Sequence, residues 1–143
     1  MAHAFSIASR MRAEDAAEGL ATYNLDPYDV MVQNLKSSDR AWTWMVDGVP
    51  ACMFGYTSPS NISNVIYPWL MTTDLVEKHR TMFLRYSRPM LEVMLSQSGK
   101  LENFVDARYK SCIRWLKWCG FTLHAPQPFG AHGLPFHRFE RSA

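Results

Sequence analysis

The sequence lacks most of the features that would place it in a specialised class. It has three cysteines, Cys52, Cys112 and Cys119, and no CxxC pair, so neither a disulfide framework nor a zinc ribbon is expected and a reducing compartment is favoured. No apolar run reaches the roughly 18 to 20 residues that span a bilayer, and the N-terminus has no basic segment followed by an apolar stretch. We therefore expect a soluble, unsecreted protein without a membrane span.

An excess of charge of one sign is also missing. Fifteen Lys and Arg against thirteen Asp and Glu leave a formal net charge of +2, which is too small for a chain whose main task is to neutralise a phosphate backbone. Nucleic acid is therefore not an expected partner. The basic residues gather between Lys78 and Arg88 and between Lys110 and Lys117, so the near-neutral total can conceal one locally positive site.

Several signature motifs are missing as well. There is no Gly-x-Ser-x-Gly, no Walker phosphate-binding loop and no dinucleotide fingerprint, so hydrolase, nucleotidase and dinucleotide-dependent functions have no motif support. The histidines His124, His132 and His137 are spaced across a proline-rich loop in a way that matches no standard ligand pattern. No metal site is predicted.

The sequence does contain enough apolar material for one globular core. Of its 143 residues, 48% are hydrophobic, 13% are aromatic and 20% are charged, a composition that can offset the entropy of the unfolded chain by burial. With ~100 to 200 residues per domain as the usual range, the length predicts a single domain over residues 1–143.

The first half of the sequence predicts short helices and a hairpin. Asp47-Gly48 between two β-rich runs is the strongest hairpin signal, and Pro50 predicts an edge or a bulge where the second arm begins. The expected elements are a strand over 5–9, helices over 12–22 and 27–38, hairpin arms over 42–46 and 49–56, an exposed loop over 57–64 and a strand over 65–71.

A long periodic segment dominates the second half. A helix is expected from Thr73-Asp74 to Gly99, with a kink at Pro89 and one apolar face. That face comprises Leu75, His79, Met82, Phe83, Tyr86, Met90 and Val93. After this long helix we expect a strand over 101–105 and an amphipathic helix over 109–119 that ends at Gly120. The remaining elements are a strand over 121–124, a loop over 126–135 and a last strand through Phe136 and Phe139.

The order of these elements indicates a mixed α/β fold with an early hairpin and later alternating units. A helix between two strands implies parallel pairing of the strand before the long helix with the strand after it. On the late helix, Lys110, Arg114 and Lys117 form one stripe opposite an apolar side, the pattern of an amphipathic helix packed on a sheet.

This order, together with local residues, resembles the GNAT (Gcn5-related N-acetyltransferase) superfamily over nearly the whole chain. Residues 12–16 resemble the start of the family's first helix, and residues 109–121 resemble its late helix, which ends in Gly-Phe. Residues 78–91 and 111–120 are similar to GNAT-like internal virion proteins of short-tailed bacteriophages. The resemblance implies a central, mixed, mostly antiparallel twisted sheet of about six to seven strands with about four helices, and a phage protein in the host cytoplasm or the virion.

The resemblance also implies acetyl-CoA as the cofactor. In the superfamily the strand before the long helix splays from its neighbour, and the pyrophosphate of acyl-CoA lies at the helix N-terminus, where free amides and the helix dipole favour an anion. Carried onto this chain, the cofactor-binding residues are Met71, Val76, Lys78, His79, Arg80, Thr81 and Cys112. The family's loop is glycine-rich, whereas residues 76–81 contain no glycine, so Lys78 and Arg80 would have to supply charge instead.

Acetyl transfer to an amine needs a base for the ammonium proton and an acid for the leaving thiolate. Counted back from Gly120, the family's tyrosine acid falls on Leu116, which cannot donate a proton, and its asparagine falls on Tyr109. The remaining candidates are Tyr109, Cys112 and Cys119 for the acid and Asp106, Glu102 and His124 for the base.

Two functions therefore stay open. The first is a phage acetyltransferase that moves an acetyl group from acetyl-CoA to an amine on a protein or a small molecule, with Phe129 and His132 setting acceptor choice. The second is a catalytically inactive GNAT-fold protein that acts as a virion component or binds a host protein. Overall resemblance favours the first function, and the absent glycines and Leu116 favour the second.

Overall fold

The computed structural model describes residues 1–59 and 62–143. Its helices are α1 (Ala2–Ser9), α2 (Ala13–Tyr23), α3 (Pro27–Ser37), α4 (Asp74–Lys78), α5 (Arg80–Leu95) and α6 (Lys110–Trp118). Its strands are β1 (Arg40–Val46), β2 (Val49–Thr57), β3 (Val65–Thr72), β4 (Lys100–Asp106), β5 (Thr122–Leu123), β6 (Gln127–Phe129) and β7 (Leu134–Ser142). The strands form one seven-stranded sheet in the order β1-β2-β3-β4-β7-β5, with β6 paired to β7, which confirms the predicted mixed fold and strand number.

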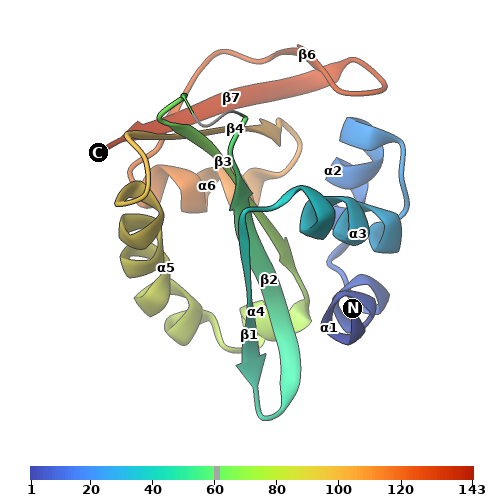
Figure 1. The fold of residues 1–143 in the computed structure, drawn as a ribbon. Coiled ribbons are helices and arrows are strands. Elements are labelled where there is room, and N and C mark those ends of the chain that lie inside the picture. Colours follow the sequence, from blue (N-terminus) through green and yellow to red (C-terminus); the bar gives the residue numbers. More distant parts are fainter. Residues whose placement is uncertain (60–61) are drawn as a thin grey trace.

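The sheet carries helices on both faces (Figure 1). Helices α1, α2 and α3 lie on one face, and α5 and α6 lie on the other. Each face has its own buried cluster: one contains Leu101 and Leu116 with residues of α5 and α6, and the other contains Ile7 and Met31 from α1 and α3. Among the described residues, no helix combines the length and apolar character needed to cross a membrane.

The predicted hairpin is present between β1 and β2. Asp47 and Gly48 connect the strands with φ angles of 48° and 78°, the pair of left-handed conformations that a two-residue type I′ turn requires. The strand register shifts between Trp44 and Met45, and Met45 pairs with Pro50. The bulge expected near this proline is therefore confirmed. It interrupts the regular pairing where Pro50 has no N–H to donate to the neighbouring strand.

Strands β3 and β4 pair only where they begin. Their parallel register contains two residue pairs, which join Val65–Ile66 to Lys100–Leu101, although each strand continues for several residues beyond them. Further along, the side-chain amide of Asn103 donates to the backbone oxygen of Pro68 at 2.7 Å. The predicted parallel pairing is confirmed, and the sheet opens between these two strands.

The segment predicted as a strand over 5–9 belongs to helix α1. Ala4 and Ile7 are fully buried, whereas Phe5 is 66% exposed, so burial follows the helical period rather than the alternation of a strand. The prediction was wrong because a run this short fits both periods. Packing of α1 against α3 and β2 selects the helix.

The segment predicted as one helix from Thr73 is divided into α4 and α5. Thr73 caps α4 as expected, because its hydroxyl accepts the Leu75 N–H at 3.3 Å. His79 then adopts φ −117° and ψ 40°, which interrupts the helical path, and Pro89 lies inside α5. With α1 and this division, the described residues contain more helices than the four expected.

The buried face of α5 also differs from the prediction. Met82, Tyr86 and Val93 are exposed, although their spacing suggested the core. The buried residues of α5 are Ser87, Leu91, Met94 and Leu95. Apolar residues occur on more than one side of this helix, so only the position of the sheet decides which side is covered.

Most other elements lie within two residues of their predicted bounds. Helix α3 begins at Pro27, with the Asp26 carboxylate accepting the Asp29 N–H at 2.9 Å. The loop predicted over 57–64 includes residues 60–61, which lie outside the described residues, and the loop predicted over 126–135 contains β6 and its turn into β7. All three cysteines are free.

Candidate functional site

A cavity of about 730 Å³ passes through the opening between β3 and β4. On one side it is lined by residues of α2 and α3, and on the other by residues of α5 and the first two strands. Its polar lining includes Asp15, Glu18, Asn34, Asn103 and Tyr109. The volume and the largely apolar lining are those of a small-molecule site with a few placed polar groups.

Asp15 on α2 closes the far end of the opening. Its carboxylate accepts the backbone N–H of Thr72 at 2.7 Å and the Thr72 hydroxyl at 2.5 Å, and the backbone N–H of Arg12 donates to the Thr72 oxygen at 3.1 Å. Burial raises the pKa of Asp15, while the bonds from Thr72 oppose that rise. The backbone of Thr72 is thus fully paired within the chain.

Glu18 lies one helical turn further along α2. Its carboxylate accepts the backbone N–H of Asp106 at 3.0 Å. Burial raises the pKa of Glu18 to about 8, and the charges of Asp15 and Asp106 add to the effect. A carboxyl group with a pKa in this range can take and return a proton near neutral pH, so Glu18 is the strongest candidate base in the cavity.

Tyr109 and Cys112 line the cavity at the start of α6. Burial is the main cause that raises the pKa of Tyr109, and the charge of Asp15 raises it further. The pKa of the Cys112 thiol is raised mainly by burial and further by the charges of Glu18 and Asp15. Both groups therefore hold their protons at neutral pH, so Cys112 is not a thiolate nucleophile and Tyr109 is a weaker acid than an ordinary tyrosine.

Asp106, a predicted base, is occupied by Arg108. The Arg108 backbone N–H donates to the carboxylate at 2.8 Å, and the guanidinium donates to it at 2.7 Å. Burial alone would raise the pKa of Asp106, but these bonds outweigh it and lower the pKa. The structure therefore places Asp106 beside the opening as an ionised, paired group, and its backbone rather than its side chain contacts Glu18.

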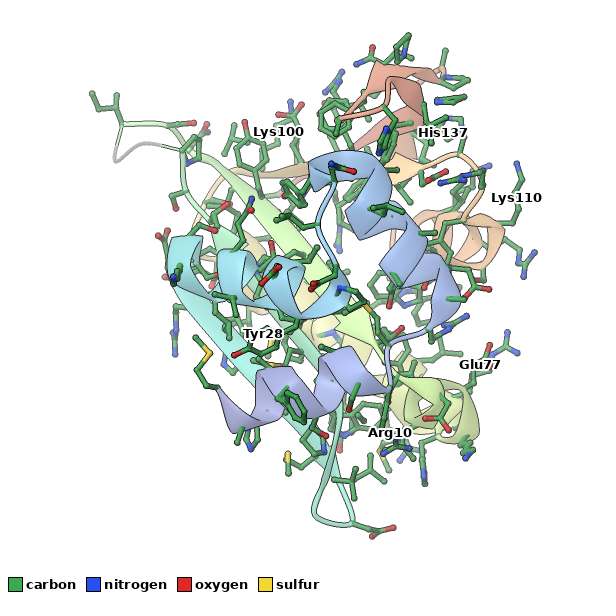
Figure 2. All side chains as sticks on the ribbon, turned by 90° about the vertical axis from the view of Figure 1, so that its right-hand side faces the viewer. Arg10, Tyr28, Glu77, Lys100, Lys110 and His137 are labelled. Atoms are coloured by element: carbon green, nitrogen blue, oxygen red, sulfur yellow. The ribbon has the colours of Figure 1, made fainter. Side chains whose placement is uncertain are left out.

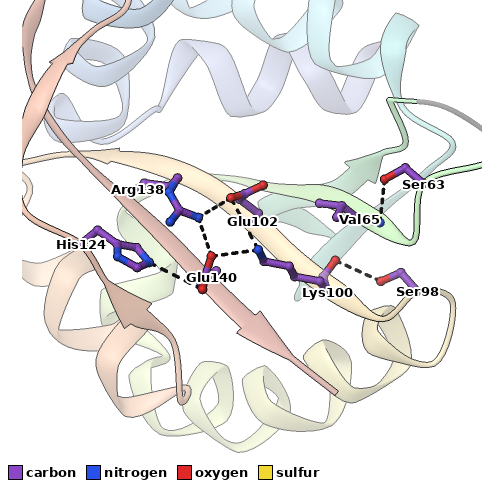
Figure 3. A network of polar contacts seen from close by, with 8 residues as sticks. All are labelled: Ser63, Val65, Ser98, Lys100, Glu102, His124, Arg138 and Glu140. Atoms are coloured by element: carbon purple, nitrogen blue, oxygen red, sulfur yellow. Dashed lines mark hydrogen bonds and ion pairs between the residues drawn. The ribbon is translucent and has the colours of Figure 1, made fainter.

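The other two predicted bases, His124 and Glu102, belong to an ion-pair network at the C-terminal half of the sheet (Figure 3). Arg138 joins Glu102 to Glu140, and His124 Nε2 lies 3.6 Å from Glu140 Oε1. Neither His124 nor Glu102 lines the cavity. The structure does not bring these two residues to Tyr109.

The predicted cofactor-binding residues fall into three groups. Val76 is the buried residue of α4, whereas Met71 and Cys112 line the cavity. Lys78, His79, Arg80 and Thr81 are exposed at the junction of α4 and α5. Lys78 pairs with Asp74 at 3.0 Å, so among these side chains Arg80 is the cation for which the described residues show no ion-pair partner.

Helix α4, which precedes this junction, carries acidic residues that the sequence interpretation did not use. Within α4, Asp74 pairs with Arg10 at 2.9 Å and Glu77 pairs with Arg12 at 3.2 Å. Figure 2 shows Arg10 and Glu77 at this helix. Both acids are therefore neutralised within the chain. An anion near this junction would meet Arg80 and the free amides at the start of α5.

Sequence reasoning missed Asp15, Glu18 and Asn34. Asp15 and Glu18 are three residues apart, so a helix places them on one face, and this spacing was the one available signal. Asn34 carries no motif. Its place in the cavity depends on how α3 packs.

The fold is similar to those of solved GNAT acetyltransferases. An N-acetyltransferase from Staphylococcus aureus Mu50 aligns with a TM-score of 0.70 at 13% identity, covering 99% of this chain and 93% of that one. An acetyltransferase from Bacillus subtilis in complex with CoA aligns with a TM-score of 0.61 at 9% identity, covering 80% and 83%. A GNAT-family acetyltransferase from Streptococcus pneumoniae aligns with a TM-score of 0.56 at 10% identity, covering 83% and 78%.

No protein-family model and no curated protein sequence matches the chain. At these low identities the structural similarity shows the fold alone, and it confirms the GNAT-like fold expected from the order of elements. Among the described residues, no group of three or more His, Cys, Asp or Glu side chains is placed to hold a metal ion.

Proposed function

We propose that the protein is an N-acetyltransferase that moves an acetyl group from acetyl-CoA to an amine. The observation that carries the proposal is the cavity that passes through the opening between β3 and β4 with Glu18 in its lining. A thioester reaching the opening from the α5 side and an amine reaching it from the α2 side can meet there. The GNAT-like fold supports the same reaction class without establishing it.

The residues of the cavity fit the proton transfers of this reaction. The ammonium proton passes to the Glu18 carboxylate, and the amine nitrogen then attacks the thioester carbonyl carbon. The new C–N bond forms as the C–S bond breaks, the acylated nitrogen gives up its second proton, and the leaving thiolate takes one up, so that the products are the amide and the free CoA thiol. Tyr109 is the candidate donor of the thiolate's proton by position, because it lines the cavity at the start of α6; burial and the nearby Asp15 raise its pKa and make it a weaker acid than an ordinary tyrosine.

The start of α5 fits the anionic part of the donor. Arg80 and His79 are exposed there, and the first amides of this 16-residue helix have no helical acceptor. Acetyl-CoA, when bound, supplies the activated acyl group. Met71 and Cys112 line the cavity into which its thioester would extend.

A second candidate function is a GNAT-fold protein of phage origin that does not catalyse transfer, and instead serves in the virion or binds a host protein in the host cytoplasm. Three observations favour it. The backbone of Thr72 is already paired within the chain, so it offers no free group to a cofactor. Helix α4 lies where a glycine-rich loop would approach phosphates. Leu116 stands at the position of a proton donor.

Acetyl-CoA binding separates these functions. We expect acetyl-CoA to raise the melting temperature by mass action, and Arg80→Ala to reduce that rise. Arg85→Ala is the matched control, because Arg85 is also an exposed arginine of α5 but lies beyond its first turn. Absence of any shift at millimolar acetyl-CoA would remove the acetyltransferase proposal and leave the second candidate.

Turnover provides the second measurement. Release of free CoA thiol in the presence of a panel of amines should depend on Glu18, so Glu18→Gln should reduce it about 100-fold or more. Glu14→Gln is the control on the same helix, because Glu14 is exposed and does not line the cavity. Equal rates in the two variants would exclude Glu18 as the base.

A further inference from the structure

Asn34 has a buried hydrogen-bond donor without a partner. Its side chain is 6% exposed, it lines the cavity, and its Nδ2 atom makes no hydrogen bond to any described residue. Buried side-chain donors are nearly always paired, because leaving one unpaired costs the free energy of removing it from water. An orphan donor on a residue that lines a ligand-sized cavity is available to an acceptor atom of a ligand.

Asn34 and Glu18 belong to the same lobe of the cavity. Helices α2 and α3 approach each other closely at Gly19, where an added Cβ would lie 2.9 Å from Val30. Glu18 adjoins Gly19, and Asn34 lies one helical turn beyond Val30 on α3. The lobe between the two helices therefore has a carboxyl group and an amide side chain in its lining.

Aromatic side chains form the remaining wall of this lobe. Phe104 and Phe129 stack with ring centroids 4.0 Å apart, and both line the cavity together with Trp69. The turn between β6 and β7 is held against α2, because Ala131 N–H donates to the Thr22 oxygen at 3.0 Å. An apolar group of the ligand can be covered here while its polar atoms meet α2 and α3.

The charges of the lobe select the sign of the ligand. Asp15 and Glu18 contribute carboxyl groups to the lining, and the carboxylate of the neighbouring Asp106 is paired with Arg108. Among the described residues that line this cavity, none is a lysine or an arginine. A cationic nitrogen beside Glu18 opposes the rise of its pKa and forms an ion pair with the carboxylate, whereas an anion meets no cation in the lining.

We propose that this lobe takes a primary amine that also carries a carbonyl oxygen and an apolar side chain, as an amino-acid amide or a peptide N-terminus does. Asn34 Nδ2 donates to the carbonyl oxygen, Glu18 faces the amine, and the aromatic wall covers the side chain. The acceptor class rests on the proposed acetyltransferase function, but the binding step requires no acyl donor.

Three related probes test the proposal in the absence of acetyl-CoA: phenylalanine amide, phenethylamine, which lacks the carboxamide, and 3-phenylpropanamide, which lacks the amine. We expect the full-length protein to bind phenylalanine amide about tenfold more tightly than either of the others by calorimetry. Equal dissociation constants for the three probes, or no saturation with phenylalanine amide, would overturn the proposal.

Two variants assign the two contacts separately. Asn34→Leu should abolish the preference for phenylalanine amide over phenethylamine while keeping the preference over 3-phenylpropanamide, and Glu18→Gln should do the opposite. Gln33→Leu and Glu14→Gln are the controls, because both residues are exposed neighbours on the same helices. Because Asn34→Leu removes an orphan donor, it should also raise the melting temperature without ligand, which separates loss of recognition from loss of folding.

The outcomes distinguish this proposal from the acetyltransferase proposal. Selective binding of phenylalanine amide without any effect of acetyl-CoA supports the amine site and removes the transferase. An acetyl-CoA shift together with equal binding of the three probes keeps the transferase and overturns the acceptor class. Unchanged probe selection in Asn34→Leu overturns the role of Asn34.

Discussion

The two walls of the cavity differ in chemistry. The wall formed by α2 and α3 carries Asp15, Glu18 and Asn34, each with a shifted pKa or an unusual hydrogen-bond state. The wall formed by α5 carries aromatic and apolar side chains such as Phe83 and Tyr86. Groups with a shifted pKa or an unpaired buried donor are typical of functional sites, so the chemistry is concentrated on the α2–α3 wall, and the α5 wall supplies mainly apolar surface.

Among substitutions compared at a single pH, the loss of Asp15 should have the largest effect on stability. Asp15→Ala leaves the Thr72 N–H and hydroxyl without their acceptor, so the free energy of unfolding should fall by about 3 kcal/mol. Urea denaturation monitored by circular dichroism measures the change. Glu14→Ala, which alters an exposed residue of the same helix, should stay within about 0.5 kcal/mol of the wild type. Similar losses in the two variants would show that Asp15 does not close the opening.

Glu18 should give the α2–α3 wall a pH-dependent stability. Its pKa is about 8 in the folded protein against an ordinary value of 4.5, so between these pH values the folded state binds more protons than the unfolded state. The free energy of unfolding therefore falls as pH rises through this window. Relative to Glu18→Gln, the wild type should lose roughly 2 to 4 kcal/mol between pH 5 and pH 8.

Denaturation curves at several pH values measure this difference. The transfer rate should rise over the same window, because the base acts only when it is ionised. Parallel stability profiles of wild type and Glu18→Gln would show that Glu18 has an ordinary pKa, and the contrast between the two walls would lose its main support.

Gly130 tests how the turn between β6 and β7 completes the α2–α3 wall. Its φ is 79°, and an added Cβ would lie 2.5 Å from the backbone oxygen of Ala21. Gly130→Ala should therefore lower the free energy of unfolding by about 1 to 2 kcal/mol and weaken acceptor binding. Gly133→Ala, at φ 63° with open space around it, carries the backbone strain without the contact. The difference between the two variants measures the docking of the turn on α2.

The smallest effect is expected on the α5 wall. Tyr86 lines the cavity but is 59% exposed, so Tyr86→Ala should change the free energy of unfolding by no more than about 0.5 kcal/mol. Tyr28→Ala is the matched control, because Tyr28 is 41% exposed, packs on Phe5 and lies outside the cavity. A loss of several kcal/mol in the free energy of unfolding of Tyr86→Ala would show that Tyr86 stabilises the fold, and it would contradict the assignment of the α5 wall as mainly apolar surface.

Local features of the chain were predictable because their causes lie within a few residues. The Asp47-Gly48 turn supplies two left-handed conformations, and Asp26 caps the helix that Pro27 begins. The late helix shows one stripe of Lys110, Arg114 and Lys117, and the structure exposes all three. The order of elements was also sufficient to predict the parallel pairing of β3 with β4.

The failures share a different cause. Residues 5–9 fit the period of a strand as well as that of a helix, and contacts with α3 decide between them. The apolar residues Met82, Tyr86 and Val93 satisfy the spacing of a core face, yet the sheet lies against another side of α5. The predicted bases His124 and Glu102 belong to an ion-pair network outside the cavity, because cross-strand pairing brings them to Glu140 and Arg138.

The sequence by itself determined the turns, the caps, the amphipathic late helix and the order of the elements from Pro27 to β3, since each depends on backbone preference or periodicity over a short stretch. Only the tertiary structure decided the site. Asp15, Glu18 and Asn34 carry no motif, and they acquire their chemistry when α2 and α3 pack beside the opening between β3 and β4. Burial and distant partners shift a pKa or leave a donor unpaired, and neither can be read from the neighbours of a residue along the chain.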